Sequence, residues 1–176
     1  EPPAIFNIDR WWSEQDLAFL CRLMKAIQTV APRLGRTRTL LSIAFCRTMI
    51  GLSNAAFNHQ SMSFKDPGVS PQMALFDHTR TEAWESHALD DLSAVLAGAD
   101  ENPVGSGEVV EGDSRDLPRL FEGGADVLVT SPPYPNRMSY VRELRPYMYW
   151  LGYLRQSHEA GDLDWKAIGG TWGSAT

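Results

Sequence analysis

The chain has 176 residues, and its hydrophobic content of 43% and charged content of 22% are those of an ordinary globular protein with one core. No apolar run reaches the roughly 20 residues that span a bilayer, and no signal peptide opens the chain, so we expect a cytoplasmic protein. The net charge of -6 argues against a uniformly basic surface of the kind that binds nucleic acid.

Residues 1–100 predict a mainly helical segment. Ser13 precedes a run with helical spacing, and Asp16 stands three residues later, which is the pattern of a capping box. This helix should end before Pro32. A second helix over about 37–52 is apolar almost all round, so we expect it to be buried. A third is predicted over about 79–96.

Other features of this half have structural interpretations. The polar stretch at about 54–72 predicts a loop, and His59 is the one histidine in it. We interpret Trp11 and Trp12 as packing residues, and Cys21 and Cys46 as buried free thiols. The four histidines lack metal-ligand spacing, so no metal site is predicted.

The pattern changes after a turn-rich linker, and residues 101–176 predict an α/β unit. Residues 108–111 and 127–130 read as short strands, with a helical turn over 116–121 between them and a helix over 138–154 that Pro146 should kink or restart. Ligands of open α/β sheets bind at the carboxyl ends of the strands. We therefore expect Asp113 and Ser131 at one edge of the sheet.

The stretch from Val109 to Tyr134 resembles the core of the amino-group DNA methyltransferases, which use S-adenosylmethionine. The catalytic tetrapeptide of that family, [DNS]-P-P-[YFW], follows a hydrophobic strand, and here it reads SPPY. Serine in its first position resembles the cytosine-N4 branch more than the adenine-N6 branch. The resemblance implies a Rossmann-like fold and a catalytic group formed by Ser131, Pro132, Pro133 and Tyr134.

The same resemblance implies a cofactor site and a gap in it. Gly112 and Asp113, with Ser114, match the position that contacts the adenine of the cofactor, although Asp113 could equally be the N-cap of the turn that follows. The glycine-rich FxGxG loop of the family does not occur in this chain. We therefore expect a fragment, or a split enzyme whose further segment or second chain carries the loop.

The predicted DNA contacts follow the tetrapeptide. Asn136 and Arg137 could line the base pocket, whereas Arg142 and Arg145 could meet phosphates or only pair with nearby carboxylates. The charge distribution permits this, because residues 66–130 hold 14 Asp or Glu and 3 Lys or Arg, whereas residues 131–176 hold 4 and 5. A basic cluster of Arg33, Arg36 and Arg38 reads first as a solvated helix start.

The resemblance thus implies a DNA methyltransferase of the restriction-modification type, which transfers a methyl group to an exocyclic base amine. Two alternatives stay open. One is a methyltransferase that acts on protein or RNA. The other is a degenerate methyltransferase domain that serves as a DNA-binding or regulatory subunit, which the missing loop favours and the intact SPPY disfavours.

Overall fold

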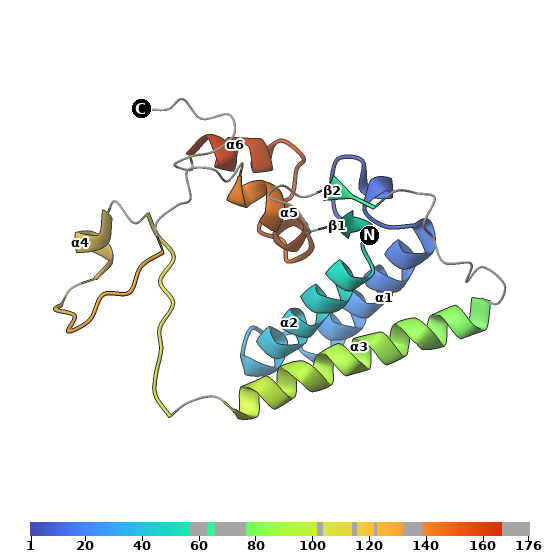
Figure 1. Ribbon diagram of the computed structural model, residues 1–176, viewed down its shortest axis with the longest axis horizontal. Helices are drawn as coiled ribbons and strands as arrows, with labels where there is room; N and C mark the ends of the chain where they lie inside the picture. The colour runs from blue at the N-terminus through green and yellow to red at the C-terminus, as the bar shows by residue number, and fades with distance from the viewer. Residues whose placement is uncertain are drawn as a thin grey trace.

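The computed structural model describes residues 1–56, 63–65, 77–101, 104–113, 116–121, 123–131 and 139–166. Within these ranges the chain is mainly helical (Figure 1). Its elements in chain order are the 3-10 helix η1 (Ile8–Arg10), α1 (Glu14–Val30), α2 (Arg36–Gly51), β1 (Ala55–Ala56), β2 (Ser63–Phe64), α3 (Asp77–Asp100), α4 (Leu117–Leu120), α5 (Tyr140–Trp150) and α6 (Glu159–Lys166).

The start of α1 follows the predicted capping box. The Ser13 hydroxyl accepts a hydrogen bond from the backbone N–H of Asp16 at 3.2 Å, and the Asp16 carboxylate accepts one from the backbone N–H of Ser13 at 3.3 Å. Two N–H groups that an α-helix cannot satisfy internally are thereby paired. The Arg80 guanidinium of α3 also lies 3.4 Å from the Asp16 carboxylate, so an ion pair joins the cap of α1 to α3.

Aromatic side chains from distant parts of the chain form the centre of the core. Trp11 and Trp12 are both buried, and their rings stack with centroids 5.6 Å apart. Trp150 of α5 meets Trp12 and Phe45 of α2 edge-on, at centroid distances of 6.0 and 5.3 Å. Edge-to-face pairs of this kind stabilise beyond the area that they bury. The packing roles predicted for Trp11 and Trp12 are confirmed.

Helices α1, α2 and α3 pack side by side, and α5 with α6 lies across the end of this group that carries η1 (Figure 1). Phe19 of α1 stacks on Trp84 of α3 with centroids 5.4 Å apart. Strands β1 and β2 form a two-residue antiparallel ladder within the predicted loop, and Phe64 meets Trp11 edge-on at 5.2 Å. The described residues among 1–100 are therefore mainly helical.

The predicted α/β fold is wrong. Within the described ranges the only strands are β1 and β2, and there is no parallel, Rossmann-like sheet. Residues 108–111 and 127–130 have no regular secondary structure. Apolar side chains of both segments are exposed, with Val109 at 99% and Val129 at 90% of full exposure.

Sequence pattern could not reveal this outcome. A parallel strand needs hydrogen-bonding neighbours and helices that cover both of its faces. Helices α1, α2 and α3 bury their apolar faces against one another, and Figure 1 shows the segment 104–131 standing away from them. Two short strands without further neighbours would be marginal in water.

Smaller differences concern which helix faces are buried. In α2, Ala44, Phe45, Thr48 and Met49 are buried, but Ile43 is 47% exposed, so the helix is not buried all round. In α5 the buried residues are Val141, Pro146, Tyr149 and Trp150, whereas Leu144 is 51% exposed. Helix α5 is continuous through Pro146 and does not restart there.

No helix in the described part of the chain combines the length and the apolar character needed to cross a membrane.

Candidate functional site

The predicted cofactor residues lie in an exposed segment. Gly112 and Asp113 are both exposed, and the backbone carbonyl of Asp113 accepts a hydrogen bond from the N–H of Asp116 at 2.9 Å. Asp116, not Asp113, is the N-cap residue of α4. Ser114 lies outside the described residues. The alternative role of Asp113 as an N-cap of residues 114–120 falls partly on residues outside the described ones and stays a prediction.

The predicted catalytic group is described only at its first residue. Ser131 is exposed at the end of the apolar run 127–130. Pro132, Pro133 and Tyr134 lie outside the described residues, as do the predicted DNA contacts Asn136 and Arg137.

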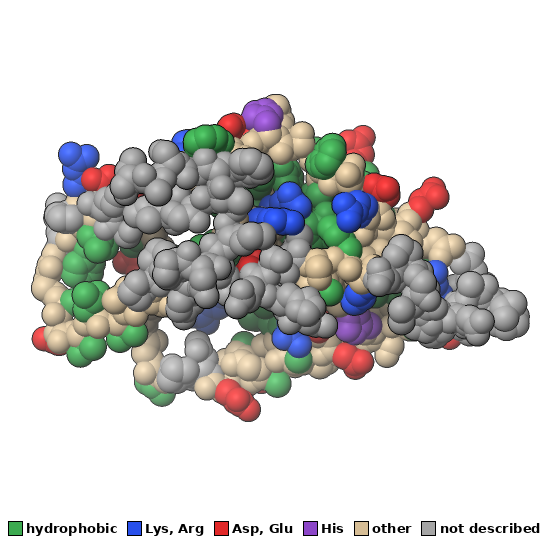
Figure 2. Space-filling view, turned by 45° about the horizontal axis from the view of Figure 1, so that its top comes forward, with side chains coloured by type: hydrophobic (Ala, Val, Ile, Leu, Met, Phe, Trp, Pro, Cys, Tyr) green, Lys and Arg blue, Asp and Glu red, His purple; other side chains and the backbone are tan. Residues whose placement is uncertain are grey.

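Gly112, Asp113 and Ser131 are exposed, and they do not line the hollows of about 830, 570 and 370 Å³ that the described helices form. Figure 2 shows hydrophobic side chains displayed at the left of the molecule, where Figure 1 places the segment 104–131.

Two of the predicted DNA contacts are brought together. Arg142 and Arg145, three residues apart on α5, line the same hollow of about 370 Å³ between α5 and α6. Residues at this spacing share one helix face. Burial lowers the pKa of the Arg145 guanidinium from its ordinary value, and the positive charge of Arg142 lowers it further.

Sequence reasoning missed two further residues of this hollow. The Ser139 hydroxyl donates a hydrogen bond of 2.5 Å to the Asp164 carboxylate of α6 and accepts one of 3.0 Å from the N–H of Arg142. Ser139 and Asp164 are each only 5% exposed. Ser139 could have been found as the N-cap of the following helix. Its bond to Asp164, 25 residues away, has no sequence signal.

The basic cluster near α2 has a structural role. Arg36 is the first residue of α2, and Arg38 donates a hydrogen bond of 3.3 Å to the backbone carbonyl of Ala31. This hydrogen bond links the start of α2 to the residue that follows α1.

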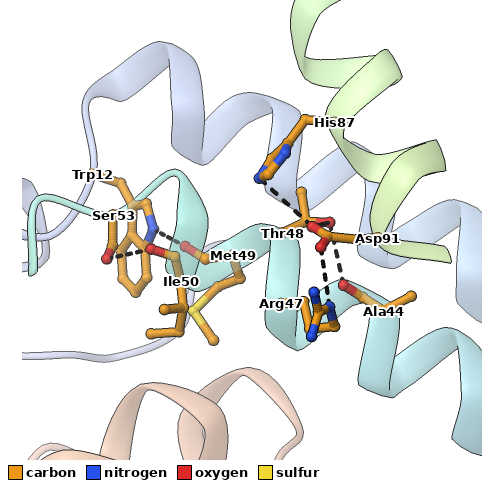
Figure 3. Close-up of polar contacts among 9 residues, drawn as sticks. All are labelled: Trp12, Ala44, Arg47, Thr48, Met49, Ile50, Ser53, His87 and Asp91. Atoms are coloured by element: carbon orange, nitrogen blue, oxygen red, sulfur yellow. Dashed lines mark hydrogen bonds and ion pairs between the residues drawn. The ribbon is translucent and has the colours of Figure 1, made fainter. Parts of the chain in front are cut away.

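A second polar group, also missed, joins α2 and α3 (Figure 3). Asp91 of α3 is 7% exposed, and its carboxylate lies 2.9 Å from the Thr48 hydroxyl and 3.1 Å from Arg47 Nε. His87 Nε2 lies 3.5 Å from the same carboxylate. A side chain at Gly51 would meet His87 at 2.5 Å, so glycine at this position lets the imidazole approach α2.

Replacing Asp91 by alanine should lower the free energy of unfolding by about 2 kcal/mol, because the buried Thr48 hydroxyl loses a charged acceptor. Arg47 adds little to this loss, since its side chain is 57% exposed and screened by water. Urea unfolding followed by circular dichroism measures the change. Asp90→Ala is the matched control, because Asp90 is the exposed neighbour on α3. Equal stabilities of the two variants would contradict the prediction.

A hollow of about 830 Å³ lies between α2, α3 and the end of α5. Its lining combines Cys46, His87, Asp91, Tyr147 and Trp150. Burial raises the pKa of the Cys46 thiol to about 11. Burial therefore disfavours the thiolate, which is the reactive form of cysteine. Cys21 and Cys46 are both free, as predicted. They are half-buried and not fully buried.

In the folded protein Cys46 should react with a disulfide reagent at pH 8 about tenfold more slowly than in the unfolded chain. Its thiolate fraction falls about a hundredfold, and the greater basicity of that thiolate restores about tenfold. A Cys21→Ser variant makes Cys46 the only reporter, and the same variant in denaturant provides the reference rate. Equal rates in the two states would show that burial does not protect the thiol.

Comparisons of the chain with protein-family models, with curated proteins and with solved structures found no match.

Proposed function

We propose that this chain contributes the catalytic tetrapeptide of a methyltransferase that modifies an exocyclic amine of a DNA base, cytosine N4 in preference to adenine N6. One observation carries the proposal: SPPY at residues 131–134 directly follows the apolar run VLVT, with Gly112-Asp113 preceding it at the spacing of the amino-group DNA methyltransferases. The exposure of Ser131 is compatible with access by a large substrate.

The chemistry explains why these residue types are needed. The lone pair of an exocyclic base amine is delocalised into the ring, so the amine is a poor nucleophile. Hydrogen bonds that the amine donates to the Ser131 hydroxyl oxygen and the Pro132 carbonyl favour a pyramidal nitrogen and localise that lone pair. Two successive prolines restrict the backbone, so the acceptors are held in place before the reaction.

The remaining roles follow from access to the base. Tyr134 stacks on a base that has left the duplex, a rearrangement that costs a few kcal/mol. S-adenosylmethionine supplies the methyl group. The amine nitrogen would form a bond to the methyl carbon while the bond between that carbon and the sulfonium sulfur breaks, so that S-adenosylhomocysteine leaves and the nitrogen releases one proton to solvent. This direct displacement needs no covalent enzyme intermediate and no cysteine nucleophile.

The missing part of the cofactor site is assigned to another polypeptide segment. The FxGxG loop is absent from this sequence, and Asp113 and Ser131 do not line the hollows of about 830, 570 and 370 Å³ between the described helices. We place the loop on a further segment or a second chain. The same observation favours a second candidate, a degenerate domain that binds DNA or regulates a partner without transferring methyl groups.

A methyl-transfer assay tests the proposal. Labelled S-adenosylmethionine and mixed-sequence duplex DNA are incubated with this chain alone and with any longer or co-purifying form, and the product nucleosides are analysed. N4-methylcytosine from the complete form supports the proposal. Methyl transfer to protein or RNA but not to DNA would contradict the proposed DNA acceptor and favour a protein or RNA methyltransferase. Salt-dependent DNA binding with no transfer by any form would favour the degenerate subunit.

A further inference from the structure

The hollow between α5 and α6 has the composition of an anion site, and we call it the arginine hollow. It is lined by Ser139, Val141, Arg142, Arg145, Ala160, Gly161 and Asp164, and its volume is about 370 Å³. Two arginines from one helix face contribute to it, and small residues of α6 form the opposite wall.

The two guanidinium groups lack charged partners among the described residues. Neither Arg142 nor Arg145 forms an ion pair with a carboxylate in the described ranges. The Nε of Arg145 is buried and has no hydrogen-bond partner there. A guanidinium whose N–H group is taken out of water without an acceptor carries a desolvation cost.

The position of Arg145 is set by an aromatic contact. Its guanidinium carbon lies 5.5 Å from the centre of the Trp11 ring, and Trp11 itself is 1% exposed. A cation held over a buried ring is oriented by the core and not by a counter-ion. The Arg145 side chain thereby lines the arginine hollow without an ion pair to a described carboxylate.

The carboxylate of the hollow does not cancel this positive charge. Asp164 accepts the short hydrogen bond from Ser139, and it lies beyond ion-pair distance of both arginines. Two guanidinium charges against one carboxylate leave a formal charge of +1, which matches a ligand with a single negative charge. A phosphodiester carries one negative charge, and the planar guanidinium fork matches its oxygens.

The place of the hollow in the chain points to DNA. Ser139 follows Ser131 by eight residues, so the two Cα atoms lie at most about 29 Å apart. That limit is about eight base pairs along a duplex, so one DNA molecule can reach both positions. We infer that the arginine hollow binds one backbone phosphate of the DNA whose base is modified, an inference that rests on the proposed function. Ser139 and Asp164 then act as positioning residues.

Salt-dependent DNA binding tests this assignment. The affinity of a labelled mixed-sequence duplex for the protein form used in the methylation assay is measured by fluorescence anisotropy at several sodium chloride concentrations. Arg142→Ala should weaken binding about tenfold at low salt and reduce the slope of log affinity against log salt by about one, equally for unrelated sequences. Arg142→Lys keeps the charge and should keep the slope.

Arg155→Ala is the matched control, since Arg155 is exposed between α5 and α6 and does not line the hollow. Equal slopes for Arg142→Ala and Arg155→Ala would overturn the inference. Stabilisation of the parent by millimolar inorganic phosphate, lost in Arg142→Ala while the DNA slope is unchanged, would overturn it in favour of a free-phosphate site. Circular dichroism of each variant establishes that it is folded.

The methylation assay run in parallel separates this inference from the proposed function. If the complete form transfers methyl groups but Arg142→Ala leaves the salt slope unchanged, the phosphate site is rejected and the proposed enzymatic function stands. If Arg142→Ala reduces the salt slope but no form transfers methyl groups, the phosphate site is supported and the proposed enzymatic function is rejected.

Discussion

Ser131→Ala is expected to reduce methyl transfer to DNA about a hundredfold in the complete, active form of the protein, a loss of the size seen when one preorganised polar group is removed from an active site. The hydroxyl oxygen is one of the two proposed acceptors for the base amine, and alanine has none. The readout is the turnover of labelled methyl groups at saturating cofactor and DNA.

Two comparisons make this result specific to the chemistry. Ser131→Asn retains a side-chain acceptor of a type that the family uses in this position, so it should keep more activity than Ser131→Ala. The DNA affinity of Ser131→Ala should stay within about twofold of the parent, because one exposed hydroxyl contributes little to phosphate-dominated binding. Full activity of Ser131→Ala would exclude the proposed role of the tetrapeptide.

Trp12→Ala is expected to destabilise the fold by about 4 kcal/mol, which is a large part of the stability of a typical domain. The ring is fully buried and packs on Trp11 and Trp150, so its removal leaves a cavity between the N-terminal segment and α5. The indole N–H also donates a 2.8 Å hydrogen bond to the carbonyl of Met49 (Figure 3). Urea unfolding followed by circular dichroism gives the change.

Trp165→Ala is the control for the loss of a tryptophan, because Trp165 on α6 is 61% exposed and its replacement should change stability by less than about 0.5 kcal/mol. Trp12→Phe separates packing from hydrogen bonding, since it keeps a ring and leaves the Met49 carbonyl without this donor, at a cost of about 1 to 2 kcal/mol. If Trp12→Ala were no less stable than Trp165→Ala, the aromatic cluster would not hold the helices together.

The charge pattern of the surface limits how DNA could be bound. Among the described residues on the face shown in Figure 2, positive, negative and hydrophobic side chains are interspersed. DNA binding through a few specific phosphate contacts is therefore favoured over electrostatic attraction spread across a whole face. This favours a site such as the arginine hollow, where two arginines converge on one volume.

The sequence by itself determined the first three α-helices and the start of α1, whereas α6 was not predicted. The Ser13–Asp16 box marked the start of α1, Pro32 limited its end, and α2 and α3 lie where the apolar spacing predicted them. These features are predictable because helix hydrogen bonds and caps join residues three or four positions apart. The two aromatic packing residues were also predictable, since paired tryptophans before a helix have few other places to lie.

Only the tertiary structure decided the rest. The run VLVT has the composition of a buried strand, but a strand exists only where another segment supplies its hydrogen bonds, and no described segment pairs with residues 127–130. The partners of Asp91 and Asp164 lie 43 and 25 residues away in the sequence. Contacts over such separations depend on how whole helices pack, and a local pattern carries no record of them.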